Sequence, residues 1–304
     1  MKTRWLAFYF VLTLAHCAQA QQDPLYGNYI NNPYVINPAY GGLTNNLSAT
    51  INYRYQWTGF EGSPVTWNAN GHISLAQNKM GVGLMLVSDQ SGASQTNELF
   101  ASYSYRLPLD DRKTLSFGLQ GGFSDYQTNN DEVNPYDAND PFFVGKRNKV
   151  APNLGTGLIL SSDRYYVSLS VPRLLEISSQ QEDLTASQYS RHFYAMGSYL
   201  LIMGEHIRLR PSVLFKGVQG SPSSIDLNAA LIFHEKYQAG LLTRDFSTYG
   251  LFTLMQIKDF LRVGYVFEVP GNGSVGSQYV THELTLGFRF NALPFHSNES
   301  VFSF

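Results

Sequence analysis

Apolar and polar residues alternate one by one through much of this chain. In residues 47–57 every second residue is apolar or aromatic, and polar residues such as Ser48, Asn52 and Arg54 stand between them. A period of two predicts an extended strand with one apolar and one polar face. The same alternation recurs in four further segments, residues 65–75, 115–124, 261–269 and 283–290. We therefore expect an all-β fold.

Two architectures produce this alternation. A soluble β-sandwich buries the apolar face in its core, whereas a membrane barrel turns that face to lipid and keeps the polar face inside. Aromatic residues stand at the ends of the apolar faces, among them Tyr53, Trp57, Tyr265 and Phe290. Such positions are typical of the girdles where a bilayer meets water. The alternating segments also reach about ten residues, the length that a tilted membrane strand needs. The pattern favours a membrane barrel.

The connections between the alternating segments differ in length. Six short turns are expected, at residues 76–79, 108–113, 161–164, 203–206, 234–237 and 257–260. Long connections are expected at residues 127–150, 173–190 and 270–279. Barrels of the bacterial outer membrane have short periplasmic turns and longer extracellular loops.

We therefore predict a transmembrane, antiparallel, up-and-down β-barrel of about 14 strands over residues 47–290. The expected strands are 47–59, 64–76, 79–89, 94–107, 113–127, 150–161, 164–172, 191–203, 206–219, 224–234, 237–246, 248–257, 260–269 and 280–290. An even number of strands places both ends of the barrel wall on the periplasmic side.

Residues 1–20 have the features of a cleaved secretion signal. A basic start precedes an apolar run over residues 5–15, and Ala18-Gln19-Ala20 provides small residues at a cleavage site. Lipidation at Cys17 is the alternative, but His16 is too large and polar to precede a lipobox cysteine. Cleavage after Ala20 removes the one cysteine of the chain, so no disulfide or thiol chemistry is expected.

Composition limits the remaining classes of protein. Only 14% of the residues are charged, against about 25% in soluble proteins. The net charge of -2 argues against a nucleic-acid partner, because phosphates demand a basic face. After the leader, no apolar run reaches the roughly 18 residues of a spanning helix.

Residues 21–46 follow no regular period and are rich in Asn, Pro, Tyr and Gly. We expect this segment to plug the lumen or to cap its periplasmic mouth, because its turns and side-chain amides can satisfy polar groups of the wall. Tyr29, Tyr34 and Tyr40 are its expected anchors. Residues 291–304 are expected to form a C-terminal periplasmic tail.

The stretch DPLYGNYINNPYVINPAYGG at residues 23–42 resembles the N-terminal signature of the PorP/SprF family of type IX secretion system membrane proteins. Matching residues there are Asn37, Pro38, Ala39, Tyr40 and Gly42. Those in RYQWTGFEGSPVT are Arg54, Gln56, Trp57, Gly62 and Pro64, and those in HELTLGFRF are His282 and Glu283. Further matching blocks follow in family order over nearly the whole mature chain.

The resemblance implies a non-enzymatic component of type IX secretion in the outer membrane, associated with protein secretion and gliding motility. It would assist export of a surface protein such as an adhesin, or anchor it, by binding its C-terminal domain. Implied partners are other type IX components, outer-membrane lipid and a periplasmic peptidoglycan-associated protein; no cofactor is implied. A diffusion channel or small-molecule transporter is the alternative function, and a barrel lipase is the third.

Motifs for catalysis or metal binding are weak. His282-Glu283 lacks the second His of a zinc HExxH pair, and Glu283 shares a face with Arg289, which favours an ion pair. No GxSxG elbow occurs. Four loop residues offer oxygen ligands for Ca²⁺, but their spacing does not match an EF-hand; they are Asp131, Asp137, Asn139 and Asp140.

Charged residues also fall on the polar faces that should line the lumen. The bases are Arg54, Arg106, Arg208, Arg210, Lys216, Arg262 and Arg289, and the acids are Glu98, Asp226, Glu268 and Glu283. They form either a salt-bridge mesh that rigidifies the wall or a charged cavity for a guest.

The long connections 127–150 and 173–190 carry apolar residues that are unusual in loops contacting only water. These are Tyr136, Phe142, Phe143, Leu174, Leu175 and Ile177. They either bind a partner or pack on one another as a lid over the mouth.

Overall fold

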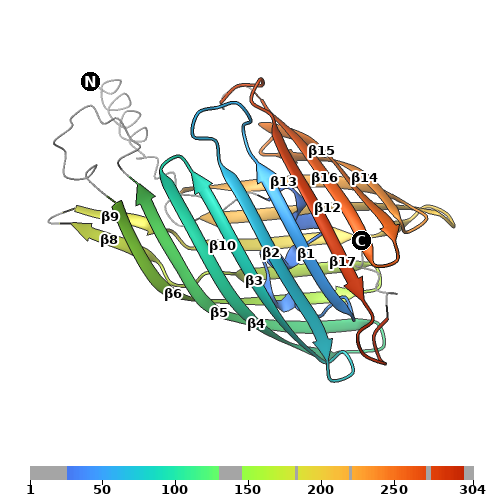
Figure 1. Ribbon diagram of the computed structural model, residues 1–304. Coiled ribbons are helices and arrows are strands. Elements are labelled where there is room, and N and C mark those ends of the chain that lie inside the picture. The colour runs from blue at the N-terminus through green and yellow to red at the C-terminus, as the bar shows by residue number, and fades with distance from the viewer. Residues whose placement is uncertain (1–25, 130–145, 182–183, 219–220, 272–274, 298–304) are drawn as a thin grey trace, which may run out of the picture.

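The structure is a computed structural model that describes residues 26–129, 146–181, 184–218, 221–271 and 275–297. Its described strands form a closed antiparallel barrel with 14 wall strands (Figure 1). They are β1 (Leu47–Tyr55), β2 (Val65–Leu75), β3 (Met80–Ser91), β4 (Ser94–Pro108), β5 (Lys113–Asn129), β6 (Lys146–Ser162), β7 (Tyr165–Val171), β10 (His192–Tyr199), β12 (Ile207–Val218), β13 (Ser221–Phe233), β14 (Tyr237–Arg244), β15 (Thr248–Lys258), β16 (Leu261–Pro270) and β17 (Thr281–Phe290).

Each wall strand pairs with its neighbours along the chain, and β1 pairs with β17 to close the ring. The two-residue strand β11 (Leu201–Ile202) continues the line of β10 beside β12. Every strand expected from the alternation overlaps one of these, so the predicted barrel is confirmed. Among the described residues, no helix is both long and apolar enough to cross a membrane.

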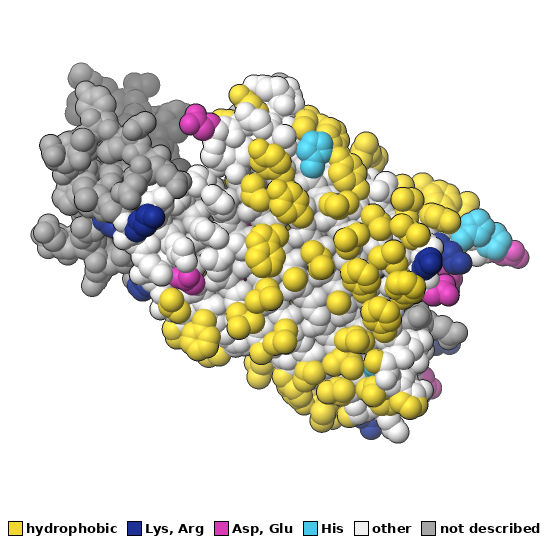
Figure 2. All heavy atoms as spheres, viewed as in Figure 1, with side chains coloured by type: hydrophobic (Ala, Val, Ile, Leu, Met, Phe, Trp, Pro, Cys, Tyr) yellow, Lys and Arg dark blue, Asp and Glu magenta, His cyan; other side chains and the backbone are white. Residues whose placement is uncertain are grey.

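The two faces of the wall separate apolar from polar residues, as the period of two requires. Leu119 is 62% exposed on the outside, while the next residue, Gln120, is 6% exposed and lines the lumen. Figure 2 shows hydrophobic side chains spread over the outer wall, with charged side chains at its two ends. The sheet therefore offers a lipid-compatible exterior around a polar interior.

The two ends of the barrel carry different connections. One end, called here the short-turn end, holds turns such as 76–79, 109–112 and 259–260. The opposite end, called the long-connection end, holds 56–64 and 172–191. At that end β5 and β6 continue their pairing out to Asn129 and Lys146, so both strands are longer than predicted.

Residues 173–190 were expected to form a loop, and this expectation was wrong in part. The chain there forms a hairpin of β8 (Ile177–Gln181) and β9 (Leu184–Tyr189), which pair with each other in a separate two-stranded sheet. The segment is too short and too polar to have shown a clear alternation.

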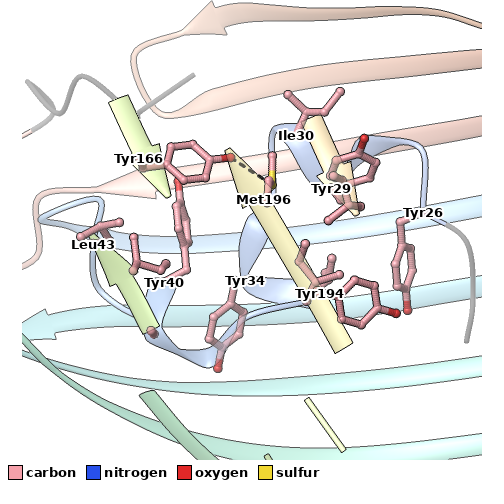
Figure 3. Packing of buried hydrophobic residues seen from close by; sticks show 14 of the residues in the cluster. Tyr26, Tyr29, Ile30, Tyr34, Tyr40, Leu43, Tyr166, Tyr194 and Met196 are labelled. Atoms are coloured by element: carbon pink, nitrogen blue, oxygen red, sulfur yellow. Dashed lines mark hydrogen bonds between the residues drawn. The ribbon is translucent and has the colours of Figure 1, made fainter. Parts of the chain in front are cut away.

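Residues 26–46, called here the N-terminal segment, lie inside the barrel (Figures 1 and 3). The segment forms three short 3-10 turns, η1 (Asn28–Ile30), η2 (Pro33–Val35) and η3 (Pro38–Tyr40). Proline starts η2 and η3, where its fixed φ suits the first position and its missing N–H is not needed. Nearly every residue of the segment is buried.

The two ends of the N-terminal segment lie at opposite ends of the barrel. Asn46 leads into β1 at the short-turn end, but Gly27 contacts Glu283 near the start of β17, at the long-connection end. The segment therefore runs along the lumen. The C-terminal residues pack at the opposite mouth, where the Ser297 backbone N–H donates to the Asn45 carbonyl at 3.1 Å.

Candidate functional site

The carboxylate of Glu283, on β17, is the main anchor of the N-terminal segment. It accepts the backbone N–H groups of Gly27 at 2.6 Å and Asn28 at 3.1 Å. It also accepts the Asn52 side-chain amide at 2.8 Å and the Arg54 guanidinium at 2.9 Å. Charge-assisted bonds of this kind are stronger than neutral ones, so a buried acid of the wall holds the start of the segment.

The same ion cluster continues across neighbouring strands. Arg54 donates to Glu268 at 2.6 Å. Arg244 pairs with Asp226 at 3.0 Å and lies 3.8 Å from Glu268. Five lumen charges thus form a salt-bridge network, in which the partner of Glu283 is Arg54 rather than an arginine of its own strand.

Asn37 of the signature ties the segment to two wall strands. Its side-chain oxygen accepts the Ala39 backbone N–H at 2.9 Å and so caps η3. Its side-chain NH₂ donates to the Leu158 carbonyl of β6 and the Leu169 carbonyl of β7, each at 3.2 Å. One asparagine therefore fixes both the local turn and its position on the wall.

Tyr40 and Gly42 of the signature meet His72 of β2. The Tyr40 and His72 rings are edge to face, with centroids 5.9 Å apart, and the Gly42 backbone N–H donates to His72 Nδ1 at 3.0 Å. Tyr34 exchanges a 2.6 Å hydrogen bond with the Ser102 hydroxyl of β4. Sequence reasoning did not single out His72 as a contact of the segment.

The tyrosines of the segment belong to a buried cluster in the lumen. In Figure 3, Tyr34 and Tyr40 lie among wall residues that include Tyr166 and Met196. The Tyr166 hydroxyl donates to Met196 Sδ at 3.2 Å, and Tyr29 accepts from the Asn228 side chain at 3.2 Å. The segment and the wall therefore share one buried cluster inside the barrel.

Glycines of the wall leave the space that the segment occupies. A Cβ added at Gly157 would lie closer than 3.0 Å to the Asn37 side chain, and one at Gly118 would meet the backbone of Ala39 equally closely. Real Cβ atoms do not approach other atoms so closely. These lumen-facing positions therefore need glycine because the segment passes directly over them.

Residues 172–175 are fastened over the wall at the long-connection end. Arg173 Nε donates to Glu98 at 2.7 Å, and a second guanidinium nitrogen bonds the other carboxylate oxygen. The Gln120 side chain donates to the Pro172 carbonyl at 2.8 Å. The base of the β8–β9 hairpin is thus fixed, although Arg173 was not among the predicted lumen charges. In the sequence, this role of Arg173 was indicated only by its place just after Pro172, where β7 ends.

Four other signature residues, Gln56, Trp57, Gly62 and Pro64, lie in the β1–β2 connection. The Gln56 backbone N–H donates to the Pro64 carbonyl at 2.9 Å. The Trp57 ring is edge to face with Phe60, and Gly62 adopts a positive φ of 72°, which favours glycine. The structure therefore brings only part of the predicted signature set together.

Other predicted residues lie elsewhere. The His282 ring is on the outer face, with its Nδ1 and the Tyr265 hydroxyl 2.7 Å apart, and Arg208 pairs with Glu235 at an exposed rim. Leu175 is exposed, Leu174 is half-buried, and Ile177 begins β8. Seven predicted loop residues fall outside the described residues: Asp131, Tyr136, Asp137, Asn139, Asp140, Phe142 and Phe143. In the part of the chain that the structure describes, no group of three or more His, Cys, Asp or Glu is arranged for a metal ion.

The wall of this chain is similar to solved outer-membrane proteins. These include Omp33 of Acinetobacter baumannii, with 13% identity, a TM-score of 0.48 and coverage of 81% of this chain and 98% of that one. A FadL homologue of Pseudomonas aeruginosa has 11% identity, a TM-score of 0.45 and coverage of 91% and 96%. The TodX monoaromatic hydrocarbon channel has 10% identity, a TM-score of 0.48 and coverage of 86% and 94%.

Sequence comparison identifies the family. No curated protein matches the chain. The family model described as type IX secretion system membrane protein PorP/SprF matches residues 18–288. This family and this fold are those of a secretion-associated outer-membrane barrel rather than of an enzyme class. The chain therefore belongs to the PorP/SprF family of type IX secretion system membrane proteins, and it is a β-barrel of the bacterial outer membrane.

Proposed function

We propose that this barrel assists the export or surface anchoring of a secreted protein, such as an adhesin, by binding its C-terminal domain at the long-connection end. The other components of type IX secretion are its partners, as membership of the family implies. In this function no solute is transported through the lumen of this chain. A periplasmic peptidoglycan-associated protein would meet the short-turn end, and outer-membrane lipid would contact the apolar wall.

The observation that carries the proposal is the way the N-terminal segment occupies the lumen. Its hydrogen bonds reach nine wall strands: β1, β2, β4, β6, β7, β12, β13, β14 and β17. A segment held by partners on so many sides favours a plug over a solute pathway. A client protein would then bind at the rim of the barrel.

The long-connection end offers a rim suited to a β-rich client. Among the described residues, β8 and β9 pair only with each other, so each has an outer edge that can pair with an added strand. The base of this hairpin is fixed by Arg173 and Glu98, which presents the edges from a rigid support. Long connections of outer-membrane barrels face the cell exterior, where a surface protein is displayed.

Replacing residues 177–189 with a short Gly-Ser turn tests client binding. The variant keeps residues 172–176 and their bonds to the wall, so the barrel should still show heat-modifiable gel mobility. We expect the exported protein to leave the cell surface and appear in the medium. A Gly-Ser replacement of the short turn 109–112 is the control and should leave surface display intact. Unchanged display in the hairpin variant would remove client binding from this hairpin.

Conductance in planar bilayers tests the plug separately. We expect the purified barrel to pass little current, because the N-terminal segment fills the lumen. Steady ohmic conductance would instead support a diffusion channel or transporter. The two experiments fail independently, since a conducting barrel can still hold a client at its rim.

A further inference from the structure

Buried charges of the lumen are divided unequally between its two halves. The buried acids among the described residues are Glu98, Asp226, Glu268 and Glu283. All of them lie toward the long-connection end, where each is paired with an arginine. In the described part of the chain, the half toward the short-turn end contains three buried arginines, Arg106, Arg210 and Arg289, together with the partly buried Arg262. That half therefore carries an excess of positive charge.

A small cavity lies in this positive half, between the N-terminal segment and the wall. Its volume is about 40 Å³. On the same scale one water molecule needs about 10–15 Å³. Its lining is largely polar and includes Asn31, Tyr40, His72, Arg262 and Arg289. The cavity has room for a few atoms beside two guanidinium groups.

Arg289 is the residue that most needs a ligand there. Its side chain is only 8% exposed, and its Nη1 is buried without a hydrogen-bond partner. A guanidinium cannot be deprotonated under ordinary conditions, and a buried charge is costly unless it is paired and hydrogen-bonded. An unsatisfied donor on a buried cation therefore points to an anion in the adjoining cavity.

His72 contributes a neutral donor. Its Nδ1 accepts the Gly42 backbone N–H, so the neutral imidazole carries its proton on Nε2. Arg262 adds a second positive charge and is only partly buried, near the beginning of β16 at the short-turn end. A ligand would therefore approach from the short-turn mouth, past Arg262 and toward Arg289.

We infer that this cavity binds a small oxyanion, a carboxylate or phosphate group, through Arg289 with support from Arg262. The planar fork of a guanidinium matches the two oxygens of such a group. The volume has room for one small anion. This inference is independent of the proposed client binding, which concerns the opposite end of the barrel.

Equilibrium dialysis of the full-length, detergent-folded barrel against inorganic phosphate tests the inference. We expect saturable binding that acetate displaces, in a fixed background of sodium chloride, whose anion is not an oxyanion. The Arg289→Gln variant should bind phosphate about tenfold more weakly, because a hydrogen bond to a charged group is lost. The control Arg208→Gln removes an arginine of the exposed rim and should bind like the unchanged protein.

The partly exposed position of Arg262 gives a second variant if Arg289→Gln does not fold. Arg262→Gln should also weaken phosphate binding, because one of the two guanidinium groups that line the cavity is removed. Absence of saturable phosphate and acetate binding to the unchanged barrel would overturn the inference. Unaltered binding in the folded arginine variants would overturn it equally, because the anion would then lie elsewhere.

Discussion

Glu283 and Gly27 are joined by a 2.6 Å hydrogen bond from the Gly27 backbone N–H to the Glu283 carboxylate, across 256 positions of sequence. The bond links the last wall strand to the beginning of the described chain. Glu283 also pairs with Arg54, so a single acid joins the closure of the barrel to the position of the N-terminal segment.

Replacing this acid should therefore weaken the whole barrel. In Glu283→Gln, Arg54 loses one of its two carboxylate partners while remaining buried, and the Gly27 N–H loses a charged acceptor. We expect a loss of about 3 kcal/mol in unfolding free energy, as for the removal of one partner of a buried ion pair. Urea titration followed by heat-modifiable gel mobility measures it.

The matched control is Glu235→Gln, which breaks the exposed pair with Arg208. Surface pairs contribute about 0–1 kcal/mol, so this variant should unfold close to the unchanged protein. If both variants lost the same unfolding free energy, the bonds of Glu283 would stabilise the barrel no more than an exposed ion pair does.

The wall glycine opposite Asn37 should not tolerate a methyl group. In Gly157→Ala the new Cβ overlaps the Asn37 side chain, so either the wall or η3 has to move. Overpacking of this kind costs about 1–3 kcal/mol, measured by the same urea titration. Gly197→Ala is the control, because the nearest atom to its Cβ would be Val213 Cγ1 at 3.8 Å. If Gly157→Ala left the free energy of unfolding unchanged, the segment would not be packed closely against β6.

Charge on the two faces of β5 should have unequal effects. Leu119→Arg puts a cation on the lipid face and should cost about 2–4 kcal/mol near the middle of the bilayer. Gln120→Arg faces the polar lumen, where the guanidinium can donate to the Pro172 carbonyl as the Gln120 amide does, so this change should cost less than the one at Leu119. Folding into lipid vesicles at increasing urea compares them. Similar tolerance of both changes would contradict the lipid-facing assignment of Leu119; Val263 and Leu286 lie on the same outer face and should behave like it.

Residues of the N-terminal segment should be shielded from reagents outside the cell. Val35 is 8% exposed, whereas Phe60 in the β1–β2 connection is 42% exposed. A bulky, membrane-impermeant maleimide should label Phe60→Cys quickly and Val35→Cys only after unfolding. Labelling of intact cells followed by gel shift provides the measurement. Rapid labelling at both positions would place the segment outside the barrel.

The alternation of residue types by itself determined the barrel. Each wall strand needs apolar residues toward lipid and polar residues toward the lumen, and this requirement is local, so it is written into consecutive residues. Leu119 and Gln120 lie on the faces that their positions in the alternation predicted. The resemblance of the stretch around Asn37 and Tyr40 also pointed to the family that the family model matches.

Only the tertiary structure decided which lumen residues meet. Glu283 and Arg289 share a face of β17, but six residues at about 3.3 Å each separate them by roughly 20 Å, so Glu283 pairs with Arg54 on the neighbouring strand. The β1–β17 register, which places Arg54 opposite Glu283, is a long-range property that no local pattern contains. The path of the N-terminal segment was undetermined for the same reason, because its bonds join residues that are far apart in sequence and become neighbours only when the barrel closes.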